Sequence, residues 1–521
     1  MKLKYYSVLS LCVLGALLST PASVWAAQQT EITISSASVL NPSAVEVVFS
    51  NQQRMTLDFY GENIFRMFQD NQGGIVRDPQ ASPEAQILVD RPRKEVGELS
   101  LTDKNGVITI STARIQIEMD KRTSLFKITD KIRQKVVVES ARPVDFMEKQ
   151  VCLSLKAHDN EYFYGGGVQN GRFSHKGKSI RIVNTNQWTD GGVASPTPFY
   201  WSTEGYGVMW YTFRPGLYDF GATDKEVVKL SHEENYLDVF FMVNDSPVAL
   251  LNDFYQLTGN PVLLPKFGFY EGHLNAYNRD YWKEDEKGIL FEDGKRYKES
   301  QKDNGGIKES LNGEKNNYQF SARAVIDRYN AADMPLGWIL PNDGYGAGYG
   351  QTSTLDGNIQ NLKELGEYAR AKGVEIGLWT QSDLHPKEGV EALLQRDIVK
   401  EVRDAGVRVL KPYVDLGRSW LSFGLNGVAD VGQIMPYYGN NARPFIFHWT
   451  DGQEHSVMQV SGRATRLEVN GNTFVSISRP ISVQDCRDNL IFLRTWMVFS
   501  VERIFRSIYV TSSGKHLLLC S

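Results

Sequence analysis

Cysteine is scarce in this chain of 521 residues, which contains four. Cys12 belongs to an N-terminal leader, and the remaining Cys152, Cys486 and Cys520 are odd in number and widely spaced. Such a set excludes a disulfide framework and lacks the spacing of a zinc site. An excess of positive charge is lacking too. The net charge of −4 gives no support for nucleic acid as a partner.

Long apolar runs are also missing. Residues 1–26 have the pattern of a signal peptide, with Lys2 and Lys4 as its positive start, Val8–Leu18 as its apolar centre and Val24–Ala26 as a cleavage signal. That centre is too short to span a bilayer, and no later run is long enough. We therefore expect an exported protein without a membrane span, located in the periplasm or outside the cell.

The length predicts two or more domains, and the sequence pattern changes once along the chain. Residues 27–260 contain short runs of alternating apolar and polar positions, such as Ile115–Met119 and Leu237–Met242, which predict a β-sandwich. Gly165–Gly167 is expected to form a tight loop. After Pro261, strand-like runs alternate with helical patterns as far as residue 447, which predicts an α/β unit with a parallel sheet.

Five short apolar runs in residues 261–447 predict buried parallel strands, because such strands are covered on both faces. The runs are Leu264–Tyr270, Leu336–Pro341, Val374–Trp379, Val407–Leu410 and Pro444–Phe447. Polar residues follow the first four runs, at the strand ends where a (β/α) barrel carries its active site: Glu271 and His273, Asn342 and Asp343, Gln381 and Asp383, Lys411 and Asp415. Residues 283–319 are too polar for a barrel wall and are expected to form a surface insertion, either a loose loop or a lid.

Several strings resemble glycoside hydrolase family 31, and they occur in the family's order: Gly268–His273, Gly337–Gly346, Ser422–Val431 and Ala442–Phe445. The resemblance covers roughly residues 30–447 and is closest to the bacterial branch with α-N-acetylgalactosaminidases and α-galactosidases. It implies a galactose-mutarotase-like N-terminal sandwich, a (β/α)8 barrel and no metal or other cofactor. The implied activity is a retaining exo-α-glycosidase acting on terminal α-linked sugars of a glycan or glycoconjugate, with α-N-acetylgalactosamine or α-galactose favoured over α-glucose.

The resemblance also assigns residues to the substrate. Asp343 would bind the terminal sugar, and Lys411 matches the family's lysine just before the nucleophile. The other expected substrate-binding residues are Trp338, Trp379, Asp383, Arg443 and His273. Trp338 could instead be ordinary core packing, and Asp383 could cap a loop.

The catalytic carboxylates depart from the family pattern. A gapless match places Tyr413 where the nucleophilic aspartate belongs, and Asp415 lies two positions later. Two residues of a strand span about 6–7 Å. A retaining mechanism needs two carboxyl groups about 5–5.5 Å apart, so Asp415 is a poorly placed nucleophile candidate.

Residues 448–521 lack the family's Trp-Ser-Gly-Asp string, whose aspartate is the acid/base. A shift of one base would restore the missing strings: Trp496-Met497 can yield Met-Asp-Gly, Val460–Arg466 can yield Trp-Ser-Gly-Asp, and Leu416–Trp420 can yield Trp-Val-Gly-Ala-Gly. We hypothesise a brief frame fault across about 412–421 and a permanent one from about His448. The chain as written is then expected to have a barrel that is incomplete after its fifth strand, an aberrant tail, no acid/base and little or no turnover.

Three alternatives stay open. One is an α-glucosidase of the same family. Another is a catalytically dead product whose β-domain at most binds carbohydrate. A free-standing sugar epimerase is disfavoured, because it would not need the strings in residues 264–447.

Overall fold

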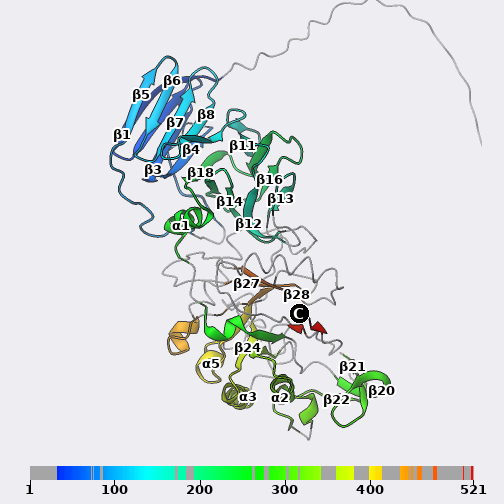
Figure 1. Cartoon of the computed structure of the whole chain (residues 1–521). Coiled ribbons are helices and arrows are strands. Elements are labelled where there is room, and N and C mark those ends of the chain that lie inside the picture. The colour runs from blue at the N-terminus through cyan, green and yellow to red at the C-terminus, as the bar shows by residue number, and fades with distance from the viewer. Residues whose placement is uncertain are drawn as a thin grey trace, which may run out of the picture.

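Strands dominate the structure and helices are few (Figure 1). The computed structural model describes residues 32–71, 73, 75–81, 86–169, 174–183, 193–260, 264–274, 281–300, 304–314, 317–341, 359–380, 398–412, 434–443, 445, 447–449, 455–459, 473–477, 508–509 and 518–519. The leader at residues 1–26 lies outside this range. No helix in the described part of the chain is long and apolar enough to cross a membrane.

An eight-stranded antiparallel sheet forms the centre of the N-terminal part. Its spatial order is β1 (Ile34–Asn41), β2 (Ala44–Phe49), β3 (Arg54–Gly61), β4 (Ile64–Asp70), β18 (Tyr236–Val243), β15 (Tyr206–Trp210), β14 (Val193–Ser202) and β12 (Phe163–Gln169). Every residue of β4 and β18 is buried, because other layers cover both faces at the middle of this sheet.

Two five-stranded antiparallel sheets pack against the inner face of the eight-stranded sheet. One has the order β5 (Ser100–Lys104), β6 (Val107–Ser111), β7 (Ile115–Asp120), β8 (Phe126–Asp130) and β9 (Lys135–Glu139). The other has the order β10 (Asp145–Phe146), β11 (Val151–Lys156), β17 (Val227–His232), β16 (Gly216–Phe220) and β13 (Ser179–Ile182). Alternate residues of β7 are buried, as expected for a strand with one face on the core.

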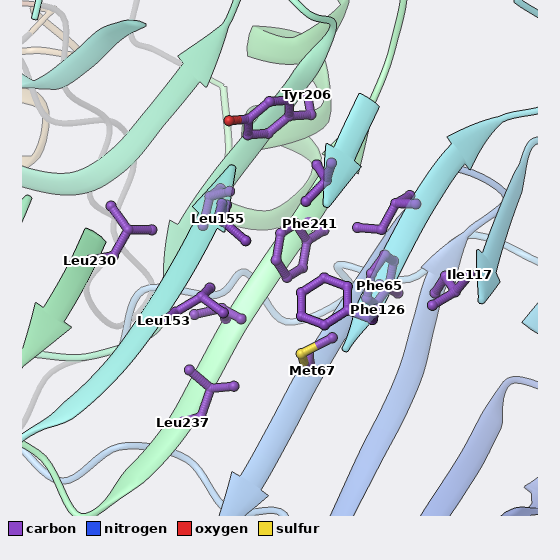
Figure 2. Close-up of a cluster of buried hydrophobic side chains, with 14 of the residues drawn as sticks. Phe65, Met67, Ile117, Phe126, Leu153, Leu155, Tyr206, Leu230, Leu237 and Phe241 are labelled. Carbon is purple, nitrogen blue, oxygen red and sulfur yellow. The ribbon is translucent and has the colours of Figure 1, made fainter. Parts of the chain in front are cut away.

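The three sheets share one hydrophobic core, part of which is shown in Figure 2. Phe65 of β4 stacks on Phe241 of β18 with ring centroids 5.3 Å apart, and Phe126 of β8 meets the same Phe241 ring edge-on at 6.0 Å. Burying each such side chain stabilises the fold by roughly 1.5–3 kcal/mol. The predicted N-terminal β-sandwich is therefore confirmed, while its bounds at residues 27 and 260 stay a prediction.

Two details of this sandwich differ from the predictions. Gly165–Gly167 lies inside β12 rather than in a tight loop, and all three glycines have positive φ. A β-carbon on Gly165 would lie 2.7 Å from the carbonyl oxygen of Phe199, so the approach of β14 requires glycine here. The second detail is a helix, α1 (Pro247–Thr258), in a region where no helix was expected. Ser246 begins it by accepting a hydrogen bond from the Ala249 backbone N–H.

The second part of the chain is built on a parallel sheet in the order β19 (Glu271–Leu274), β23 (Leu336–Leu340), β24 (Glu375–Thr380) and β25 (Val409–Pro412). The helices α2 (Ala322–Ala331), α3 (Ile359–Ala371) and α5 (Ile398–Arg403) connect these strands and lie on one side of β24 (Figure 1). The predicted strand–helix alternation is confirmed for these four strands. The (β/α)8 barrel, incomplete after about its fifth strand, stays a prediction.

The first predicted strand, Leu264–Tyr270, is wrong in position. Lys266–Phe269 forms a 3-10 helix, η1, and the strand begins at Glu271. Pro265 precedes η1 with φ −65°, the value that proline enforces and that favours a helical start.

The expected surface insertion is a small folded unit. Its strands β21 (Arg296–Ser300), β20 (Tyr281–Leu290) and β22 (Ile307–Lys308) form a three-stranded sheet in that order, followed by the 3-10 helix η3 (Tyr318–Phe320). Trp282 stacks on Phe320 with ring centroids 5.5 Å apart, and Tyr297 and Phe291 complete this aromatic core.

The described residues of the tail pair differently from the preceding strands. Phe445 is fully buried, and its carbonyl oxygen accepts a hydrogen bond from the Leu410 N–H. Beyond it, β26 (Phe447–Trp449), β27 (His455–Gln459) and β28 (Thr473–Ile477) form an antiparallel sheet, and β29 (Ile508–Tyr509) pairs with β30 (Leu518–Leu519). The pairing thus changes from parallel to antiparallel near the point where the sequence departs from the family strings.

Candidate active site

The two faces of the parallel sheet have different surroundings. Ile339, Ile376, Leu378 and Leu410 pack with residues of α2, α3 and α5 in one buried cluster. The opposite face carries a separate cluster, here called the inner cluster: Leu264, Trp338, Leu340, Val409 and Phe445. Because neighbouring residues of a strand point to opposite faces, this assignment fixes the face of each register position along the ladder.

Trp338 belongs to the inner cluster and is 5% exposed. Its ring lies across Gly272 of β19, where a β-carbon would come within 2.2 Å of two indole carbons. The ring also meets Phe445 at a centroid distance of 5.5 Å and an angle of 63°. Trp338 is therefore packed into the floor of the inner face, which is the core-packing alternative of the sequence analysis.

Trp379 and Lys411 occupy neighbouring register positions of β24 and β25. Two residues before them, Gly377 and Val409 are partners on the inner face, and a β-carbon on Gly377 would lie 2.5 Å from Val409 Cβ. Since the facing of a strand repeats every two residues, the positions of Trp379 and Lys411 belong to the inner face, nearer the C-terminal end of the strands.

His273 lies on the helix-covered side. Its Nδ1 is 3.1 Å from the Tyr329 hydroxyl of α2, and the two rings meet edge-on at 5.6 Å. Burial, with a smaller effect from Arg328, lowers the pKa of His273 to about 4, so the ring is neutral near pH 7. This geometry gives no support to a substrate contact by His273.

Tyr329 was not singled out from the sequence. Burial raises the pKa of its hydroxyl, and the nearby Glu271 carboxylate raises it further. Its spacing from Ala322 and Ile326 along α2 was the available signal, but this spacing indicates only a buried helix face.

Arg443 lies at the end of the strands opposite to the C-terminal ends, where the predicted polar site residues follow. It directly precedes the predicted fifth strand, and its Nη1 donates a hydrogen bond of 3.4 Å to the Leu264 carbonyl, which precedes β19. Both residues therefore lie at the N-terminal ends of their strands. In a parallel barrel the N-terminal ends of the strands contribute to stability, whereas the catalytic residues lie at the C-terminal ends.

The predicted carboxylates Asp343, Asp383 and Asp415, together with Tyr413, lie outside the described residues. The strands that precede these aspartates are described. β23, β24 and β25 end at Leu340, Thr380 and Pro412, three residues before each aspartate. Among the described residues, no group of three or more His, Cys, Asp or Glu could hold a metal ion.

The fold and the strand ends together define a two-part protein, a three-sheet β-sandwich followed by a parallel α/β sheet. Residues 54–219 match the model of the glycosyl hydrolase 31 N-terminal galactose mutarotase-like domain. The chain is 29% identical over 157 residues to the alpha-xylosidase XylQ of Lactiplantibacillus pentosus, covering 29% of this chain and 19% of that protein. It is 22% identical over 328 residues to alpha-glucosidase 2 of Bacillus thermoamyloliquefaciens, covering 61% of this chain and 36% of that protein.

Among solved structures, the GH31 dextranase FjDex31A of Flavobacterium johnsoniae matches with a TM-score of 0.62 and 14% identity, over 81% of this chain and 55% of that one. The chain thus spans about half or less of these proteins' lengths. The matches thus show a glycoside hydrolase 31-like N-terminal domain in residues 54–219, and the named relatives are glycosidases.

Proposed function

We propose that this chain derives from a retaining exo-α-glycosidase, and that its parallel sheet is the first half of a (β/α)8 barrel spanning residues 261–447. The observation that carries the proposal is the ladder β23-β24-β25, because Asp343, Asp383 and Asp415 each follow the end of one of these strands by three residues. The carboxyl ends of parallel strands meet at one edge, so we expect the three acids at the same edge.

In this proposal Asp343 binds the terminal sugar, and Trp379, Asp383 and Lys411 line the pocket around it. Trp338 supports them from the floor of the inner face, while His273 and Arg443 serve the packing of the strands. The nucleophile would be a carboxylate after β25, and Asp415 is the available candidate. A second carboxyl group about 5–5.5 Å away would have to act as acid/base.

Two observations point to different terminal sugars. The named relatives are an α-xylosidase and an α-glucosidase, and the related dextranase has been solved with isomaltotriose. These names favour an α-glucoside or α-xyloside. The family strings in residues 268–445, taken together, instead resemble the branch with α-N-acetylgalactosaminidases and α-galactosidases. Hydrolysis of a panel of 4-nitrophenyl α-glycosides separates the candidates, and cleavage of the β-anomers alone would contradict the whole proposal.

A second candidate is a non-catalytic product that at most binds carbohydrate. It is favoured by residues 448–521, which lack the acid/base string and whose described strands β26, β27 and β28 pair in the antiparallel sense. Under the frame-fault hypothesis, turnover of the chain as written is low, and restoring the frame across 412–421 and from His448 should raise it. Nucleotide sequencing of codons 408–521 gives the direct test. An in-frame gene with no shifted strings would refute the frame fault.

We also propose that residues 1–26 direct export. Expression of the full chain in a Gram-negative host, followed by N-terminal sequencing of the periplasmic fraction, should show a mature chain beginning at Ala27. Retention of Met1 in a cytoplasmic product would contradict it.

A further inference from the structure

The outer face of β2 and β3 carries a surface hollow that the proposed active site does not use. Its volume is about 670 Å3, which lies within the range of small-molecule sites. Glu46, Arg54, Thr56, Asp58, Arg93 and Leu40 are among the side chains that line it, and we call it the sandwich hollow. In Figure 1, β1 and β3 lie in the upper, N-terminal body, whereas β24 lies in the lower one.

The hollow exists because the cover of the eight-stranded sheet is incomplete. Helix α1 packs on β18 and β15 on this outer face. On β2 and β3 the inward residues are buried in the sandwich core, while Glu46, Thr56 and Asp58 alternate with them and face outward. Glu46 and Thr56 are register partners, so the polar groups form a compact row across two strands.

Two arginine–carboxylate pairs organise this row. Arg54 Nη1 donates to both Glu46 carboxylate oxygens at 2.9 Å, and Arg93 donates to Asp58 Oδ1 at 2.7 Å and Oδ2 at 2.5 Å. The Arg93 guanidinium also lies over the Tyr60 ring, 3.9 Å from its centre, which adds a cation–π contact. The carboxylates are 18% and 14% exposed and form the floor, while the arginines, 52% and 45% exposed, form the rim.

The charges of the hollow select against ions. Two arginines and two carboxylates sum to zero, and either a phosphate or a metal cation would have to displace an existing partner. A neutral hydroxyl group can bind without displacing either partner. It can donate to a remaining carboxylate lone pair and accept from a guanidinium N–H, since within the described residues Nε and Nη2 of Arg54 make no hydrogen bond.

Apolar side chains flank the polar floor. Leu40 is 51% exposed and Ile75 is 88% exposed, and both border the hollow. A ligand that fits must therefore combine hydroxyl groups at its edge with C–H groups on its faces, which is the surface of a pyranose ring. We propose that the sandwich hollow is a second, non-catalytic site for a neutral oligosaccharide. Such a site would hold a glycan whether or not the chain turns substrate over.

Hydrogen exchange of the full chain with maltotriose locates the binding. We expect slower amide exchange in peptides covering residues 38–60 and 86–96. Protection confined to 336–341 and 374–412 would show binding at the proposed active site alone and would overturn the inference. Inorganic phosphate should leave residues 38–60 unchanged, and protection there by phosphate without maltotriose protection would also overturn it.

Variants then identify the groups responsible. The double variant Arg54→Leu/Arg93→Leu should weaken maltotriose binding by about tenfold or more in calorimetry. The matched control Lys127→Leu removes another surface ion pair of the sandwich, with Glu118, and should stay within about twofold of the original chain. Thr56→Trp fills the hollow without removing either arginine, so it keeps the test valid if the double variant does not fold. Unchanged affinity in both hollow variants would refute the site.

Discussion

Replacing Gly272 by alanine tests how the floor of the candidate active site is held. The added β-carbon would lie 2.2 Å from Cε2 and Cζ2 of Trp338, whereas carbon atoms pack at about 3.5–4.0 Å. The indole ring would have to retreat by on the order of 1 Å. Phe445 packs against the same indole ring, and Trp338 is 5% exposed, so little solvent space is available for that movement.

Overpacking of this kind costs about 1–3 kcal/mol, and we expect Gly272→Ala to lower the free energy of unfolding by that amount. Trp338→Phe removes the two indole carbons that the alanine would strike. In the Trp338→Phe background, Gly272→Ala should therefore cost less than half of what it costs alone. The coupling between the two positions should be about 0.5–3 kcal/mol.

The assay is urea unfolding followed by far-ultraviolet circular dichroism, because one variant removes a tryptophan and would disturb a fluorescence signal. All four proteins of the cycle are compared at the same pH. If the two single changes add within about 0.5 kcal/mol, the rings and the glycine do not interact as described. A neutral Gly272→Ala variant would refute the packing outright.

Three further predictions concern buried charges and the facing of the strands. Arg66→Met should lower the unfolding free energy by about 3–5 kcal/mol, because it leaves the Asp238 carboxylate buried without its two 2.7 Å hydrogen bonds from Arg66. Adding Asp238→Leu to this variant should recover part of the lost stability. A further loss of stability in the double variant would refute the reasoning. Burial lowers the pKa of His232 from 6.5 to about 4, so on acidification the unfolded chain takes up a proton at this histidine at a higher pH than the folded chain does. The unfolding free energy should therefore fall by up to about 3 kcal/mol as the pH drops from 6.5 to 4. A His232→Gln variant with an equally steep pH profile would contradict this. His273→Gln should lower the melting temperature and leave sugar binding unchanged. Trp379→Ala should weaken sugar binding about tenfold or more in calorimetry. The reverse pattern would show that these two residues are assigned to the wrong faces of the parallel sheet.

Much of the fold could be predicted from the sequence, because the spacing of its apolar residues indicates which positions are buried. The runs at Leu336 and Val374 are strands, and the alternation of Ile115–Met119 gives the one-sided burial of β7. The first and last residues of each strand were harder to predict from the sequence. The run at Leu264 looks as apolar as the others, but Pro265 starts a 3-10 turn and delays the strand to Glu271.

Facing of the site residues was harder to predict, because it depends on contacts between segments distant in sequence. The pairing of β19 with β23 has a register shift between Glu271 and Gly272. In a strand of four residues, one such shift decides which side chains face the helices, and it places His273 against Tyr329. Gly165 is a similar case, since its need for glycine comes from the backbone of Phe199 on another strand.

The insertion shows how a polar stretch can still fold around a few aromatic residues. Trp282, Phe291, Tyr297 and Phe320 are few among many charged residues, yet they share one core. Arg328 of α2 packs over the Phe291 ring at 5.2 Å and forms an ion pair with Glu292. These contacts join the described part of the insertion to α2, and whether it acts as a loose loop or as a lid stays a prediction.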